Sequence, residues 1–192
     1  MADEPKLTFP RYTLPAIIAH WLIAVLMIGN LALGLLAEKL PEEDIRLAID
    51  THKSIGITVL GLVLLRISWR LSHRPPPFSE GMAWWERGLA HAAHFGLYMF
   101  MLWMPLTGWL HDSAWKAAPE IPMRLFGLFE WPRVGFILSM PDEPKESLHA
   151  LFGAMHEIGG YALIALLLVH IAGALKHQFI DHEPEFHRMW PR

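Results

Sequence analysis

The chain has 192 residues, of which 53% are hydrophobic and 18% are charged, and its formal net charge is −3. Soluble domains carry roughly 25% charged residues, so this chain has too little polar surface for a soluble globule of its length. The near-neutral charge excludes a basic surface for nucleic acid. The absence of cysteine excludes disulfides, thiolate zinc sites and iron–sulfur clusters.

Twelve histidines and nine tryptophans are unusual for a chain of this length. Tryptophan is enriched where a bilayer meets water, because its ring is apolar and its N–H seeks a polar partner. Together with the low charge, this composition indicates an integral membrane protein.

Four long apolar stretches predict transmembrane helices at about 14–37, 52–71, 84–110 and 149–179. A helix needs about 20 apolar residues to cross the hydrocarbon, and lipid leaves a spanning backbone no alternative but a closed barrel. The first stretch is longer than a signal-peptide core and follows the acidic segment MADEP, so we interpret it as a helix of the mature protein. We therefore expect an all-α, up-and-down four-helix bundle in one transmembrane domain over residues 1–192.

The connections between these stretches set the expected orientation. Residues 38–51 are predicted to form a short acidic segment, HRPPP in 72–83 an extended run, and 111–148 a long outer loop. Basic residues prefer the cytoplasmic side, which places both termini there. Nine of the 16 basic residues lie on that side: Lys6, Arg11, Arg66, Arg70, Arg74, Arg87, Lys176, Arg188 and Arg192.

The histidines within the apolar stretches fall at two depths. His156 and His170 are 14 residues apart, which returns to nearly the same helix face after a rise of roughly 21 Å. His20 opens the first helix at the inner level, and His52 opens the second at the outer level. Alternating helix direction therefore pairs His20 with His170 and His52 with His156.

Two imidazoles that face each other at one depth are the ligand set of a six-coordinate haem iron. Ionisable residues within a membrane are costly and usually functional, and zinc prefers four ligands clustered at one depth. His91 and His94 open the third helix at the inner depth, so either is an alternative ligand there. Small residues, which give a macrocycle room, stand four positions after the four paired histidines: Ala24, Gly56, Gly160 and Ala174.

Two basic residues are candidates to neutralise haem propionates. Arg66 follows His52 by 14 residues, so it lies on the same face at the inner depth. Lys53 adjoins His52 and could bind a propionate at the outer level or attract an anionic donor. The other histidines are expected to be solvated, with His149 at the surface and the rest in loops or tails, namely His73, His111, His182 and His187.

The four helices resemble the bacterial di-haem cytochrome b561 family and the related cytochrome b subunits of hydrogenases and formate dehydrogenases. The resemblance covers IIAHWLIAVLMIGNLALGL (17–35), THKSIGITVLGLVLLRISWRL (51–71), ERGLAHAAHFGLYMFMLWMPLTGWL (86–110) and HEIGGYALIALLLVHIAGALKHQF (156–179). It implies a bacterial inner-membrane protein with two b-type haems, whose ligands by position are His20, His52, His156 and His170. It also implies that His94 and His177 lie near the inner haem, where family members bind ubiquinone.

An iron with two histidine ligands has no open position, so the expected chemistry is outer-sphere one-electron transfer. We expect electrons to pass from an outer, periplasmic donor to the quinone pool. The family includes a superoxide:ubiquinone oxidoreductase, so the resemblance makes superoxide a candidate donor and leaves open whether this chain is an enzyme. The alternatives are a membrane-anchor subunit of a larger respiratory oxidoreductase and, from another class, a histidine-lined transporter or proton channel without a cofactor.

Overall fold

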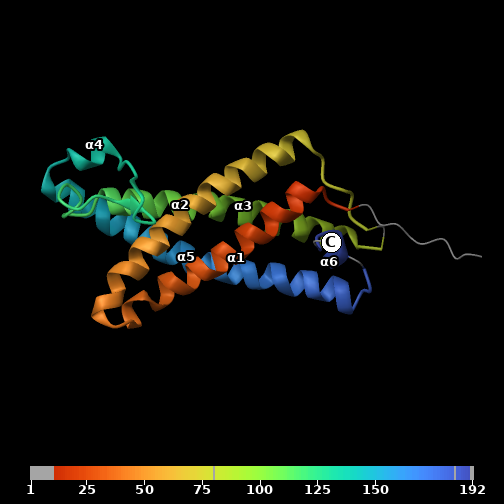
Figure 1. Ribbon diagram of the computed structural model, residues 1–192. Coiled ribbons are helices and arrows are strands. Elements are labelled where there is room, and N and C mark those ends of the chain that lie inside the picture. Colours follow the sequence, from red (N-terminus) through yellow and green to blue (C-terminus); the bar gives the residue numbers. More distant parts are fainter. Residues whose placement is uncertain (1–10, 80, 184, 191–192) are drawn as a thin grey trace, which may run out of the picture.

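The computed structural model describes residues 11–79, 81–183 and 185–190, so Lys6 and Arg192, used above to assign orientation, lie outside it. Four long helices dominate the fold (Figure 1): α1 (Leu14–Leu36), α2 (Glu42–Ser72), α3 (Trp84–Ser113) and α5 (Asp142–Phe179). The short elements are η1 (Ala37–Lys39), β1 (Arg124–Leu125), β2 (Phe129–Glu130), α4 (Gly135–Leu138) and α6 (Glu185–Arg188).

Helices α2 and α5 begin earlier than predicted, ten and seven residues before the expected starts at 52 and 149. Each follows an extended proline, Pro41 or Pro141, and each has acidic residues in its first turn. Carboxylates stabilise the positive end of a helix dipole, so these segments continue the helices beyond the apolar run. The prediction that the short acidic segment 38–51 connects two helices was therefore wrong for residues 42–51, which belong to α2.

Three helices are long and apolar enough to cross a membrane, within Leu14–Lys39, Glu42–Ser72 and Asp142–Phe179. They correspond to the first, second and fourth predicted spans. Helix α3 has 30 residues but is not among them, because histidine, glycine, tryptophan and Pro105 interrupt its apolar sequence. A crossing by α3 therefore stays a prediction. The three candidate membrane helices expose large apolar side chains suited to lipid, including Val25, Leu65, Ile158 and Val169.

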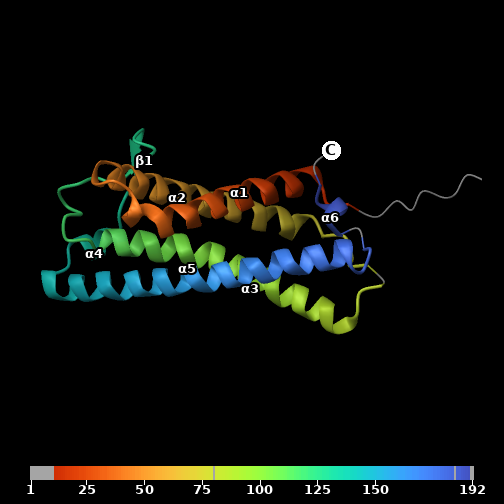
Figure 2. The same cartoon turned by 90° about the horizontal axis from the view of Figure 1, so that it is seen from below.

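The long helices form two layers, which Figure 2 shows from below. Helix α1 packs on α2, α3 packs on α5, and the two layers meet through α2 and α3. In the part of the chain that the structure describes, α5 makes no comparably close contact with α1 or α2. Side chains that α5 directs toward α1 or α2 therefore cross a space between the layers.

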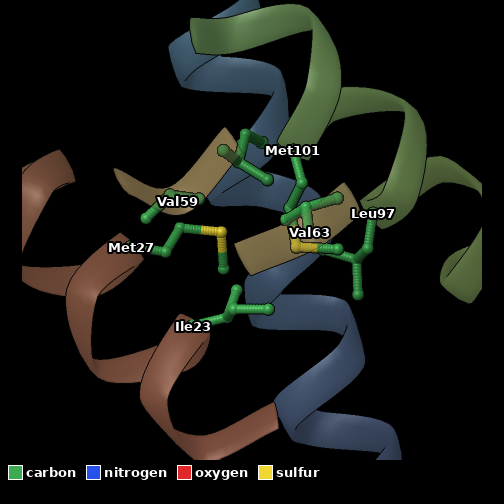
Figure 3. Packing of buried hydrophobic residues seen from close by; sticks show 7 residues of the cluster. Ile23, Met27, Val59, Val63, Leu97 and Met101 are labelled. Carbon is green, nitrogen blue, oxygen red and sulfur yellow. The ribbon is translucent and has the colours of Figure 1, made fainter. Parts of the chain in front are cut away.

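An apolar layer fills the middle of this space (Figure 3). It joins buried residues from all four long helices: Ile23, Met27, Val59, Val63, Leu97, Met101 and Leu163. Leu163 lies seven residues from His156 and seven from His170, so the apolar layer lies between the two predicted histidine levels. It separates them with side chains that carry no strong hydrogen-bond donor or acceptor.

The segment between α3 and α5 is more ordered than a plain loop. Its strands β1 and β2 pair in antiparallel register, and the turn between them uses positive φ at Phe126 (50°) and Gly127 (71°). The Phe126 amide donates to the Ser54 hydroxyl at 2.9 Å, and Leu125 packs on Ile57. These contacts dock the hairpin on the outer half of α2.

Candidate functional site

The structure brings together both pairs of histidines predicted from sequence. The ring centroids of His52 and His156 are 5.9 Å apart, and those of His20 and His170 are 6.3 Å apart. Each pair joins α5 to a helix of the other layer, across the space between the layers. These four imidazoles therefore form an outer pair and an inner pair, with the apolar layer between them.

Backbone carbonyls of the facing helices orient both outer imidazoles. The His52 Nδ1 atom lies 3.0 Å from the Asn30 carbonyl oxygen, and the His156 Nδ1 atom lies 3.0 Å from the Met104 carbonyl oxygen. The Thr107 hydroxyl lies 3.2 Å from the same Nδ1 atom of His156. A histidine whose Nδ1–H donates to a carbonyl keeps Nε2 free as a metal ligand, so these bonds select the ligating tautomer.

Two glycines allow the imidazoles to come this close to the helix backbone. A Cβ atom added at Gly34 would lie 3.0 Å from His52 Cε1, and one added at Gly108 would lie 3.0 Å from His156 Cε1. Each glycine stands four residues after the carbonyl that the imidazole contacts. Sequence reasoning missed both, although a glycine inside an apolar helix costs stability and could have been flagged on that ground.

The inner pair is organised differently. No hydrogen bond to either ring, His20 or His170, occurs among the described residues, and a third imidazole lies beside them. The His94 ring is 5.3 Å from that of His170. His91 instead contacts Phe78, at 5.0 Å. His94 and His170 come from helices of the same layer, whereas His20 faces His170 from the other layer, as His52 faces His156.

A cavity of about 710 Å³ opens at the outer pair, a volume in the range of pockets that bind molecules of cofactor size. Its lining includes His52 and His156, together with Gly56 and Gly160, which the sequence singled out as making room. Lys53 also lines it, but its ammonium binds the buried Asp112 carboxylate at 2.6 Å. At the outer level, Lys53 is therefore already paired within the chain.

The predicted propionate ligand Arg66 lies at the inner level as expected. Its Nε donates to the Tyr98 hydroxyl at 3.0 Å and its guanidinium donates to the Ala16 carbonyl at 2.6 Å. Ala16 and Tyr98 each stand one helical turn from an inner histidine, His20 and His94 respectively. Arg66 thus adds a positive charge beside the inner imidazoles.

The predicted quinone-site residue His177 lies in an ion-pair cluster at the inner end of α5. Its Nδ1 contacts the Asp181 carboxylate at 2.8 Å, and Lys176 binds both Asp181, at 2.6 Å, and Glu86, at 2.7 Å. The hydrogen bond from Lys176 lowers the pKa of Asp181 below its ordinary value, and His177 contributes a smaller effect. Among the described residues no contact joins His177 to the inner histidines, so the structure does not bring it together with His94.

Two histidines expected to be solvated are not. His111 belongs to the last turn of α3 rather than to a loop, and His149 is half-buried in α5. Their rings stack at 3.9 Å, and each Nδ1 bonds the other residue's carbonyl oxygen, at 2.9 and 3.0 Å. The predictions for these two residues were wrong, because α3 and α5 extend beyond the apolar spans. Exposure of His73, His182 and His187 agrees with the expectation.

The two pairs fit the axial positions of haem iron. Two imidazoles on opposite sides of one metal have ring centres about 6 Å apart, given a metal–nitrogen bond of about 2 Å on each side. Both observed separations, 5.9 and 6.3 Å, agree with this requirement. The wide spacing between α5 and the other layer supplies the room, and the fixed tautomers of the outer rings suit metal binding.

Comparison with known proteins points to the same chemistry. The family model for prokaryotic cytochrome b561 matches residues 11–192. Cytochrome b561 homolog 2 of Escherichia coli (strain K12) is 30% identical over 93% of this chain and 90% of its own length. Cytochrome b561 homolog 1 of the same organism is 26% identical over 95% and 98%, and a probable superoxide oxidase CybB of Yersinia pestis is 24% identical over 95% and 97%. This chain therefore belongs to the prokaryotic cytochrome b561 family, membrane proteins that transfer electrons on b-type haem.

Proposed function

We propose that this protein binds two b-type haems and transfers electrons from a donor on the outer, periplasmic side to quinone at the inner side of a bacterial inner membrane. The observation that carries the proposal is the pair of imidazole separations, 5.9 Å for His52–His156 and 6.3 Å for His20–His170. Two sites of this kind on one helix, α5, lie roughly 21 Å apart along its axis.

Bound between each pair, a b-type haem supplies an iron that changes between its ferric and ferrous states by one electron. Because two histidines face each other at each level, the chain leaves no coordination position for oxygen. His52 and His156 hold their rings through carbonyl hydrogen bonds, which limits reorganisation when the charge at the site changes.

The apolar layer keeps the path between the two sites dry. Val63 and Leu163 are almost fully buried and, like Met27 and Met101 beside them, offer no strong hydrogen-bond donor or acceptor. An electron can tunnel through such packing, whereas a proton needs a chain of polar groups or water. The chain therefore separates electron transfer from proton movement across the middle of the membrane.

Arg66 is the residue that we assign to an inner propionate, since its guanidinium lies beside the inner histidines. For Lys53 we retain the role of attracting an anionic donor, because its pairing with Asp112 leaves it less suited to a propionate. The name of the Yersinia pestis relative, a probable superoxide oxidase, makes superoxide the first donor to test. His94, beside His170, is the residue that we assign to the quinone site; His177 is the weaker candidate.

The reduced-minus-oxidised absorption spectrum and the haem-to-protein ratio of the purified protein test this proposal. We expect two low-spin b-type haems per chain, and one after His52→Ala or His156→Ala, with the inner haem retained. A colourless protein would favour the histidine-lined channel, and one haem per chain in the wild type would contradict the pairing.

Two further measurements test the reaction. A superoxide pulse given to purified protein with ubiquinone should reduce the quinone if superoxide is the donor, and a reduced quinone yield after Lys53→Gln would support its role. Co-purification with a large soluble partner, together with no response to superoxide, would instead favour the membrane-anchor alternative.

A further inference from the structure

A second, smaller cavity lies at the inner end of the molecule, away from the large cavity of the outer pair. Its volume is about 150 Å³, and it lies between the start of α1, the end of α2 and the middle of α3. Of the described residues that line it none is acidic, and four are arginines: Arg11, Arg66, Arg70 and Arg74. Such a lining favours an anionic ligand.

Among the described residues none of these four guanidinium groups forms an ion pair with a carboxylate, although other basic residues do, such as Arg46 with Asp50 and Lys176 with Glu86. Arg70 lies over the ring of Tyr98, with Cζ 5.7 Å from its centroid. The C-terminal end of α2 favours positive charge, but the helix dipole amounts to only about half a charge. An external anion would offset the remaining repulsion.

The depth of the cavity identifies the anion. The apolar run of α2 ends at Trp69, so Arg70 and Arg74 lie where the hydrocarbon gives way to lipid headgroups. Trp69 lines the cavity and donates its indole N–H to the Thr13 hydroxyl at 2.9 Å, an arrangement typical of a side chain at the membrane interface. Basic pockets between helices at this depth suit lipid phosphates.

Of the four arginines, one lies on the histidine side of the cavity and three lie toward its aqueous end. Arg66 donates to Ala16, one turn from His20, and therefore serves the histidine side of the cavity. Arg70 follows it by one turn of α2, Arg74 lies in the extended segment just after the end of that helix, and Arg11 precedes α1 at the same end. The part of the cavity next to Arg11, Arg70 and Arg74 is thus open to a ligand that arrives from the lipid.

We propose that this cavity binds the phosphate of an anionic phospholipid from the cytoplasmic leaflet, held by Arg70 and Arg74 with Arg11 at the rim. The lipid would fasten α1 to the end of α2 beside the inner haem site. Guanidinium groups suit this role because they bind phosphate oxygens through paired N–H donors. This inference does not depend on the donor or acceptor of electrons.

The test is thermal unfolding of the purified haem-loaded protein in detergent, after removal of endogenous lipid. Added phosphatidylglycerol should raise the unfolding temperature by about 3–6 °C, since a ligand that binds only the folded state stabilises it by mass action. Phosphatidylcholine at the same mole fraction should give less than about a third of this rise. An equal rise with both lipids would overturn the proposal.

Variants localise the effect. Arg70→Gln/Arg74→Gln should remove most of the rise with phosphatidylglycerol, and Arg70→Lys/Arg74→Lys should retain part of it. Arg124→Gln is the matched control, because Arg124 is an exposed arginine of the outer hairpin that pairs with Glu130. If the double glutamine variant does not fold, Arg74→Gln alone serves, since Arg74 is exposed. A full rise in the variants that remove one or both guanidinium groups would reject the site.

Two other outcomes would indicate a different ligand for this cavity and would overturn the lipid proposal. An equal rise with millimolar inorganic phosphate would make the ligand a soluble anion. Loss of the inner haem band in Arg70→Gln/Arg74→Gln would indicate a cofactor carboxylate. Haem content is read from the same samples by absorption, so failure of this proposal is distinguishable from failure of the di-haem assignment.

Discussion

The outer and inner histidine pairs each take one imidazole from α5 and one from the other layer, yet the protein holds their rings in different ways. At the outer pair, each Nδ1 atom lies 3.0 Å from a backbone carbonyl and each ring rests against a glycine. At the inner pair, neither ring has a hydrogen bond within the described residues, and Arg66 brings a positive charge next to them. The outer site is thus preorganised by the backbone, and the inner site is shaped by charge.

This difference has a direct consequence for electron flow. A hydrogen bond from Nδ1–H makes the imidazole a more basic ligand, which stabilises ferric iron and lowers the reduction potential. A nearby guanidinium favours the added electron and raises the potential. Both effects act in the same direction, so we expect the outer haem to have the lower potential and electrons to move inward spontaneously.

The largest expected effect concerns which imidazole faces His170. His20→Ala should remove the inner haem and leave one haem per chain, because we propose that His20 is the ligand that faces His170 from the opposite layer. His94→Ala should keep two haems, although the His94 ring lies closer to His170, at 5.3 Å compared with 6.3 Å for His20. The haem-to-protein ratio of each purified variant measures this, and loss of a haem in His94→Ala would assign the ligand to α3.

A second prediction tests the backbone contacts of the outer pair. Gly34→Ala or Gly108→Ala places a methyl group about 3 Å from Cε1 of an outer imidazole, so the ring must shift and its carbonyl bond weaken. We expect roughly 10-fold weaker retention of the outer haem, the lower end of the effect of losing an orienting partner. The inner haem should be unaffected, and haem loss during dilution, followed by absorption, measures both.

Gly61→Ala is the matched control for these variants, because a Cβ atom at Gly61 would have no neighbour within 4 Å. Alanine is favoured over glycine in a helix by up to about 1 kcal/mol, so the control should be as stable as the wild type or more so. Equal haem loss in Gly61→Ala and Gly34→Ala would show that the glycines serve helix packing rather than the imidazoles.

A third prediction addresses the order of potentials. Redox titration should resolve two components, and Thr107→Val should raise only the lower one, since it removes a hydroxyl 3.2 Å from the outer His156 Nδ1. Arg66→Gln should lower only the higher one. Each shift should be on the order of 40–60 mV, the equivalent of about 1 kcal/mol for one electron. Shifts in the opposite components would reverse the proposed direction of flow.

The sequence was sufficient to predict the paired histidines and three helices that are long and apolar enough to cross a membrane. The reason is that both follow from fixed quantities, the length needed to span lipid and the helical period that separates His156 from His170. The fourth predicted crossing, by α3, stays a prediction, since the tryptophans and histidines of this helix lower its hydropathy. The N-terminal ends of α2 and α5 were also missed, because both helices begin with acidic turns that lie outside the apolar runs.

The contacts that orient the outer site could not be predicted from one helix at a time. The Asn30 carbonyl meets His52, and Gly34 makes room for that ring, only because α1 packs on α2 with one particular register. The stacked His111 and His149 likewise depend on the register of α3 against α5. A periodic pattern shows which face of a helix is buried, but it does not show which residue of the next helix lies opposite.

The smallest predicted effect distinguishes the two ends by charge. Lys53 lies at the outer level and is paired with Asp112 at 2.6 Å, so only part of its charge acts on an approaching molecule. Lys53→Gln should slow reduction by the anionic iron(II)–EDTA complex about 2- to 5-fold at low ionic strength, and it should not slow reduction by hexaammineruthenium(II). At 0.5 M salt the difference should vanish, since charges then act over only about 4–5 Å. Arg124→Gln, an equal change of charge on the outer hairpin, should have little effect, because Arg124 is exposed, is paired with Glu130 and does not line the cavity of the outer histidines. If stopped-flow measurements found the two complexes slowed alike in Lys53→Gln, the lysine would support the structure of the outer site rather than attract the donor to it.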